Sequence, residues 1–167
     1  MQNTNLSDKE LKKYGKEFKK SLKARKAELD TFVPCINDVI DYIDFVADSG
    51  QNFPLCDAVH NLEIMNPEMS HLFIPMMEDI CDNTLKQLNE SDTAYESVMS
   101  IHKTIKKMQE TIKEGGEVIV PFSKAVNILQ TINPDITPII LSYLKDIAKE
   151  FKEWLDTTRN NYNLINL

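Results

Sequence analysis

An apolar repeat in the first third of the chain constrains the fold more than any other feature of the sequence. Steps of four and three residues from Leu11 reach eleven positions, and nine of them are apolar. These positions are Leu11, Gly15, Phe18, Leu22, Arg25, Leu29, Phe32, Ile36, Val39, Ile43 and Val46. Such spacing places one apolar stripe along one side of a helix of about ten turns. The pattern therefore predicts an all-α protein built around a long helix.

Pro34 lies inside this repeat, yet the register does not slip there. A proline inside a helix removes a backbone donor and kinks or breaks the helix. Because the apolar stripe continues unchanged on both sides, we expect a kink at Pro34 within one helix. A short break, with residues 30–31 as stop and restart, is the alternative.

Start and stop signals divide the rest of the chain into further helices. Ser7 and Glu10 form a capping box ahead of the first helix, and Gly50 closes that helix. The remaining helical patterns lie over residues 52–65, 67–88, 93–114, 121–132 and 137–156. The strand-like run Glu117–Val120 is interpreted as the lead into the helix that follows it.

These patterns together predict the architecture. We expect a single all-α domain over residues 1–167, a helical bundle of about four long and two short helices with a long kinked N-terminal helix. The last eleven residues, 157–167, are polar and rich in asparagine, and are expected to form a frayed tail.

The net charge of −7 is distributed unevenly along the chain. Residues 1–30 carry nine basic and five acidic side chains, whereas residues 31–167 carry ten basic and twenty-one acidic ones. Between Lys9 and Lys26, lysine occupies eight of the thirteen positions that lie outside the apolar stripe. We therefore expect residues 1–30 to project from the bundle as a basic helical arm.

Cysteine use and hydropathy bear on the compartment. The three cysteines are widely spaced and form no CxxC motif, which is typical of free thiols in a reducing compartment such as the cytoplasm. No apolar stretch is long enough to span a bilayer, and no secretion signal opens the chain. Delivery by a non-classical signal stays open.

The leading functional interpretation is a non-enzymatic protein–protein interaction module, such as an adaptor, effector or regulatory bundle. The N-terminal helix, or a groove beside it, would bind a partner protein or a second copy of the chain through apolar anchors at helical spacing. The expected anchors are Leu11, Phe18 and Leu22. The basic neighbours expected to orient an acidic partner are Lys12, Lys19 and Lys23.

A metal-dependent, di-iron-like bundle enzyme is the main alternative. Asp57 and His60, and likewise Glu68 and His71, form carboxylate-x-x-His pairs, which place both side chains on one helix face. Further carboxylates would have to come from Asp41, Asp44, Glu78 or Asp79. The Asn66-Pro67 break between the two pairs and the ordinary preference of acids for a first helical turn favour a solvated or capping role.

A second alternative is peripheral binding to an anionic membrane through residues 8–26, a basic amphipathic stretch. The acidic residues within that stretch weaken this hypothesis. Nucleic acid is disfavoured as a partner, because the strongly acidic remainder of the chain would repel a polyanion.

Other residue clusters favour ordinary structural roles. The acidic stripe around Asp41 and Asp44 is typical of a solvated helix face, and the methionines between Met65 and Met77 of core filling. Cys56 and His60 lie four residues apart, but no glycine-rich turn is present nearby to form an oxyanion hole. No cofactor is expected, enzymatic activity is disfavoured, and no motif assigns the chain to a family.

Overall fold

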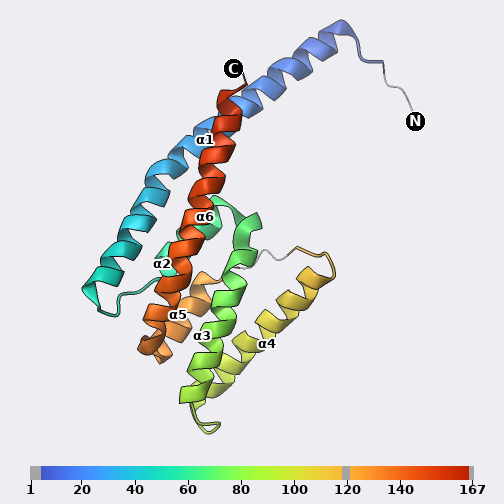
Figure 1. Ribbon diagram of the computed structural model, residues 1–167. Coiled ribbons are helices and arrows are strands. Elements are labelled where there is room, and N and C mark those ends of the chain that lie inside the picture. Colours follow the sequence, from blue (N-terminus) through green and yellow to red (C-terminus); the bar gives the residue numbers. More distant parts are fainter. Residues whose placement is uncertain (1–4, 118–120, 166–167) are drawn as a thin grey trace.

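The computed structural model describes residues 5–117 and 121–165 (Figure 1). All regular structure within these ranges is helical, which confirms the expected bundle of four long and two short α-helices. The helices are α1 (Asp8–Ser49), α2 (Cys56–Met65), α3 (Ile74–Gln87), α4 (Thr93–Lys113), α5 (Ser123–Ile132) and α6 (Thr137–Asn163), with the 3₁₀ helices η1 (Pro67–Phe73) and η2 (Pro134–Ile136). Residues 118–120, which hold most of the predicted lead into α5, lie outside the described ranges.

Helix α1 is continuous through Pro34, so the alternative of a break is wrong. The predicted capping box is present at its start, where the Ser7 hydroxyl accepts from the amide of Glu10 and the Glu10 carboxylate accepts from the amide of Ser7 at 2.8 Å. Gly50 ends the helix at a φ of 63°, a conformation that glycine adopts without a side-chain clash. Figure 1 shows the helix changing direction near its middle.

Helix α6 runs antiparallel to α1 and packs along it (Figure 1). The predicted stripe supplies the α1 side of this contact, where Leu29, Ile36 and Ile43 are buried. The facing side of α6 buries Ile140, Leu144, Ile147, Phe151 and Leu155. Burying each such side chain contributes about 1.5–3 kcal/mol, so this pair of helices forms a large part of the core.

The remaining helices complete the core on the other side of α6. Phe73 of η1 lies in contact with Phe151 and with Phe122, each pair with ring centroids 6.1 Å apart. Helices α3 and α4 form an antiparallel hairpin (Figure 1), with Val98 and Ile105 of α4 buried. The bundle is thus stabilised mainly by apolar stripes that the sequence pattern predicted.

Two predicted boundaries are wrong. Asn66 does cap a helix, with its side chain accepting from the amide of Glu68, but Pro67 begins the 3₁₀ helix η1 instead of an α-helix. The predicted frayed tail is helical as far as Asn163. Its residues make tertiary contacts that the local sequence does not reveal: Tyr162 packs partly buried against the core, and Arg159 donates to Asp30 of α1 at 3.0 Å.

Candidate interaction surface

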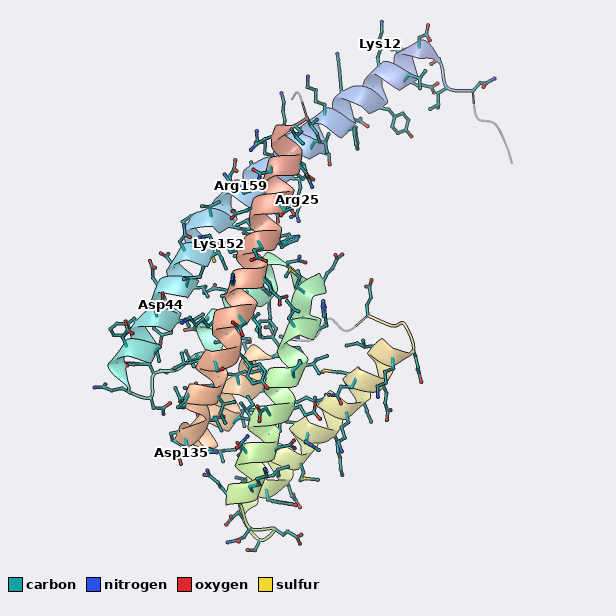
Figure 2. All side chains as sticks on the ribbon, viewed as in Figure 1. Lys12, Arg25, Asp44, Asp135, Lys152 and Arg159 are labelled. Carbon is teal, nitrogen blue, oxygen red and sulfur yellow. The ribbon has the colours of Figure 1, made fainter. Side chains whose placement is uncertain are left out.

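The first part of α1 projects from the bundle. Every described residue from Asn5 to Ser21 is exposed, and Asp8–Ser21 is called the arm from here on. Three large apolar side chains of the arm lie in solvent, with Leu11 53%, Tyr14 63% and Phe18 67% exposed. Figure 1 shows the arm running beyond the C-terminal end of α6, and Figure 2 shows Lys12 near its free end.

The exposed apolar side chains continue the face of α1 that packs on α6. Leu29 follows Leu22, and Ile36 follows Leu29, at seven-residue intervals, and seven residues almost complete two helical turns. Leu22 is half-buried and Leu29 is fully buried. Phe18 precedes Leu22 by four residues and Leu11 precedes it by eleven, so both lie on the same side of the helix as this row. The arm therefore presents the bundle-facing stripe of α1 with no helix of the described chain packed on it.

Charged side chains flank the arm's stripe differently on its two sides. Helical geometry places one row of lysines on one side of the stripe, and this row is called the lysine flank. Its members are Lys12, Lys16, Lys19 and Lys23, all exposed. The opposite side carries Glu10 and Glu17, also exposed and seven residues apart. A partner that covers the stripe therefore meets positive charge on one side and negative charge on the other.

Asp30 shows which side of α1 a packed helix can reach. It follows Lys16 and Lys23 at seven-residue intervals, so it continues the line of the lysine flank into the bundle. There the Asp30 carboxylate pairs with Arg159 of α6, with 3.0 Å between Nε and Oδ1. A helix packed on the stripe thus reaches this flank with a charged side chain of opposite sign.

The predicted arm of residues 1–30 is too long. Arg25 and Lys26 are half-buried and Leu29 is fully buried, so the projecting part ends before Leu22. Arg25, the charged residue of the stripe, donates to Glu28 at 2.6 Å and so keeps its head at the surface. Of the predicted anchors, Leu11 and Phe18 are freely accessible.

The four predicted metal ligands lie in exposed positions on two different elements. Asp57 and His60 are on α2, whereas Glu68 and His71 are on η1. The His71 ring contacts the backbone carbonyl of Glu68 at 3.1 Å, a local contact within one turn. In residues 5–117 and 121–165, no group of three or more His, Cys, Asp or Glu side chains is placed to hold a metal ion. The predicted ligands therefore do not form a common site.

The further carboxylates considered for that site have other surroundings. Glu78 accepts from Gln109 of α4 at 2.8 Å, and Asp79 accepts from the Tyr143 hydroxyl of α6 at 2.9 Å. This hydrogen bond to Asp79 raises the pKa of Tyr143. Asp41 and Asp44 are exposed on α1. These acids join helices or face solvent.

Methionines and cysteines fill the core or line grooves. Met65, Met76 and Met77 are buried. Burial also raises the pKa of the Cys81 thiol to about 12, which keeps it protonated and unreactive. A groove of about 660 Å³ between α1 and α2 includes Cys35, whose pKa burial likewise raises. The three thiols are free.

Two buried polar residues were not predicted. Glu63 of α2 accepts from the amide of Phe122 at the start of α5, and its burial raises its pKa. Gln130 of α5 accepts from the amide of Leu55 at 3.0 Å and donates to the carbonyl of Phe53 at 2.7 Å. Both satisfy backbone groups of distant segments, for which a single sequence carries no local signal.

Comparisons with protein-family models, with curated proteins and with solved structures found no match to this chain. Among the described helices, none combines the length and the apolar character needed to cross a lipid bilayer. The arm, with three large apolar side chains exposed at helical spacing, is the surface feature of the described chain that most resembles a binding site.

Proposed function

We propose that this protein is a non-enzymatic helical interaction module that binds a protein partner through its arm. A single observation carries the proposal: the apolar stripe that packs on α6 continues into solvent as Leu11 and Phe18, with the exposed Tyr14 beside them. Exposed apolar residues scattered singly are normal on a protein surface, but a row at helical spacing indicates an interaction site.

The spacing of these residues suits a known mode of recognition. Helices that bind in a groove use anchors at positions i, i+3 or i+4, and i+7, and Leu11, Tyr14 and Phe18 match this pattern. Aromatic anchors often dominate binding energy, and covering the exposed part of each of these side chains would contribute about 1–2 kcal/mol, since about half to two-thirds of each is exposed. The arm can supply this energy without refolding, because it is already helical.

A matched pair of substitutions tests the proposal. Phe18→Asp places a charge on the stripe, whereas Ala27→Asp places the same charge nine residues later, on the opposite side of α1. Both positions are exposed, so both variants should keep the circular dichroism spectrum and urea midpoint of the wild type.

The readout is the set of proteins retained from native lysate, identified by mass spectrometry. We expect the wild type and Ala27→Asp to retain the same discrete partner in stoichiometric amount, and Phe18→Asp to lose it. Identical profiles for all three proteins would contradict the proposal.

A further inference from the structure

We infer that the partner contributes an acidic amphipathic helix, which packs on the arm in line with α6 and places carboxylates against the lysine flank. This inference rests on the proposed function, since it names the chemical class of the partner that the arm would bind. It follows from the packing of α6, from the distribution of charge on the arm and from the absence of a complementary surface on a second copy.

The packing of α6 provides the geometric template. Helix α6 lies antiparallel on the stripe of α1 and ends near the bundle-side end of the arm (Figure 1). Near that end, Arg159 reaches across the helix pair to Asp30 on the line of the lysine flank. A second helix placed on the arm along the same line would reach Lys16 and Lys23 in the same manner, because they precede Asp30 by fourteen and seven residues.

The sign of the charges specifies the partner. Within the part of the chain that the structure describes, no lysine of the flank forms an ion pair. The four like charges lie three or four residues apart, so they repel one another along the helix. Carboxylates on a bound helix would relieve this repulsion, whereas a basic helix would increase it.

A second copy of this chain does not offer the required surface. In a symmetric antiparallel pair of arms, each flank would face the same flank of the other copy, so lysines would oppose lysines. A parallel pair would place each lysine flank against Glu10 and Glu17 of the other copy, but the second α1 would then continue into the line along α1 that α6 occupies. Outside the arm, the large exposed apolar residues of the described helices lie singly, as Phe45 on α1, Ile64 on α2 and Ile112 on α4. None of these helices carries a second unpartnered apolar stripe for the arm to cover.

An anionic lipid surface fits the arm less well than an acidic helix. An amphipathic helix that lies on such a surface benefits from cationic side chains along both edges of its apolar face. Here one edge carries Glu10 and Glu17, which the headgroups would repel. One acidic and one basic edge instead suit a partner helix whose own edges are charged in the complementary sense.

Two charge-reversed variants with equal net charge test the inference. The first, Lys12→Glu/Lys19→Glu/Lys23→Glu, alters the lysine flank. The control, Lys9→Glu/Lys13→Glu/Lys20→Glu, alters the three lysines on the side of the helix opposite the stripe. All six positions are exposed, so both variants should fold as the wild type does.

The probes are two synthetic helical peptides with the same leucine stripe, one with glutamates and one with lysines at the positions that would face the lysine flank. Fluorescence anisotropy should show the glutamate peptide binding the wild type and the control about tenfold or more tightly than the lysine peptide. The flank variant should reverse this preference, and Phe18→Asp should bind neither peptide.

Equal binding of the two peptides, or equal weakening by the flank variant and the control, would overturn the inference. A wild-type dimer in light scattering that Phe18→Asp abolishes would overturn it in favour of a second copy. Sedimentation with phosphatidylserine vesicles that both triple variants lose equally would overturn it in favour of lipid. If the lysate partner is still lost only in Phe18→Asp, the proposed function survives each of these results.

Discussion

The two parts of α1 share one helix and one apolar stripe, but only one part is covered. From Leu29 to Val46 the stripe is buried under the bundle, whereas from Leu11 to Phe18 it lies in solvent. The local pattern does not distinguish them, since the repeat has the same spacing in both. What differs is the presence of α6, which ends beside the middle of α1.

The two parts of α1 also differ in the charge of their exposed side chains. The arm is lysine-rich, while the outer face of the packed part carries acids that include Asp38, Asp41 and Asp44, all exposed. One amphipathic helix thus packs into the core along one part and stays exposed along another, and the exposed part is the one proposed to bind a partner. Substitutions on the stripe should therefore act on stability in one part and on binding in the other.

The largest expected effect comes from the same substitution made in both parts. Leu29→Ala should lower the free energy of unfolding by about 2–5 kcal/mol, because Leu29 is fully buried and its truncation leaves a cavity. Leu11→Ala should change it by less than about 0.5 kcal/mol, because Leu11 is 53% exposed. Urea unfolding followed by circular dichroism measures both, and equal losses would show that the arm is part of the core.

Glu63 of the bundle and Glu10 of the arm have pKa values shifted in opposite directions, so a change of pH should affect the two parts differently. Burial raises the pKa of Glu63 above its ordinary value of 4.5, with a smaller opposing effect from the Phe122 and Ser123 amides and from His60. The folded state therefore holds the proton more tightly than the unfolded state. Its stability should fall as pH rises from about 4.5 through the raised pKa, by at most about 1.4 kcal/mol per pH unit.

Comparison with Glu63→Gln isolates this contribution. Glutamine can still accept from the Phe122 amide but does not titrate, so the difference in unfolding free energy between wild type and variant should shrink or reverse as pH rises. Glu10 behaves in the opposite sense, because hydrogen bonds from Ser7 lower its pKa, and their loss at acid pH should affect only the first turn of the arm. A parallel pH profile for wild type and Glu63→Gln would contradict this prediction.

A smaller effect is expected at the boundary between the two parts. Leu22 is half-buried where α6 ends, so Leu22→Ala should cost about 1 kcal/mol, between the values for Leu11 and Leu29. Urea unfolding under the same conditions provides the measurement. A loss of stability as large as that of Leu29→Ala would show that the packed part of α1 begins closer to Phe18.

The smallest effect on global stability should follow removal of the helix cap. Ser7→Ala removes the hydroxyl that accepts from the Glu10 amide, a contact worth about 1 kcal/mol to the local helix. Because the first turns of the arm pack on nothing in the described chain, they can unfold without the bundle. Amide hydrogen exchange should accelerate near Glu10 and stay unchanged near Ile36, and faster exchange at both would show that the arm and bundle unfold together.

Several features were predictable because their causes are local. The capping box at Ser7, the stop at Gly50 and the stripe of α1 depend on residues close to one another in the chain, and all three are present. The 3₁₀ helix η1 was not predicted, because Asn66-Pro67 marks a start without specifying the helix type. The buried roles of Glu63 and Gln130 depend on backbone groups of distant segments.

The candidate interaction surface was likewise predictable only in its local features. The sequence predicted Leu11 and Phe18 as anchors with lysines beside them, because helical periodicity is a local property of the chain. The structure shows that both side chains are exposed. It did not locate the start of the packed region, and it left open whether the charged ligands of a metal site would meet. Their exposed positions on α2 and η1 were settled only by the folded chain.

By itself, the sequence determined that α1 is one long amphipathic helix with a basic N-terminal part, since periodicity, capping residues and charge are local properties of the chain. Only the tertiary structure decided which part of that helix is covered. The Arg159–Asp30 ion pair joins residues 129 apart in the chain near the end of α6. How much of the stripe is covered depends on where α6 ends once both helices have packed. A stripe indicates that a helix has a face to bury, whereas the length of the opposing helix determines how much of it remains exposed.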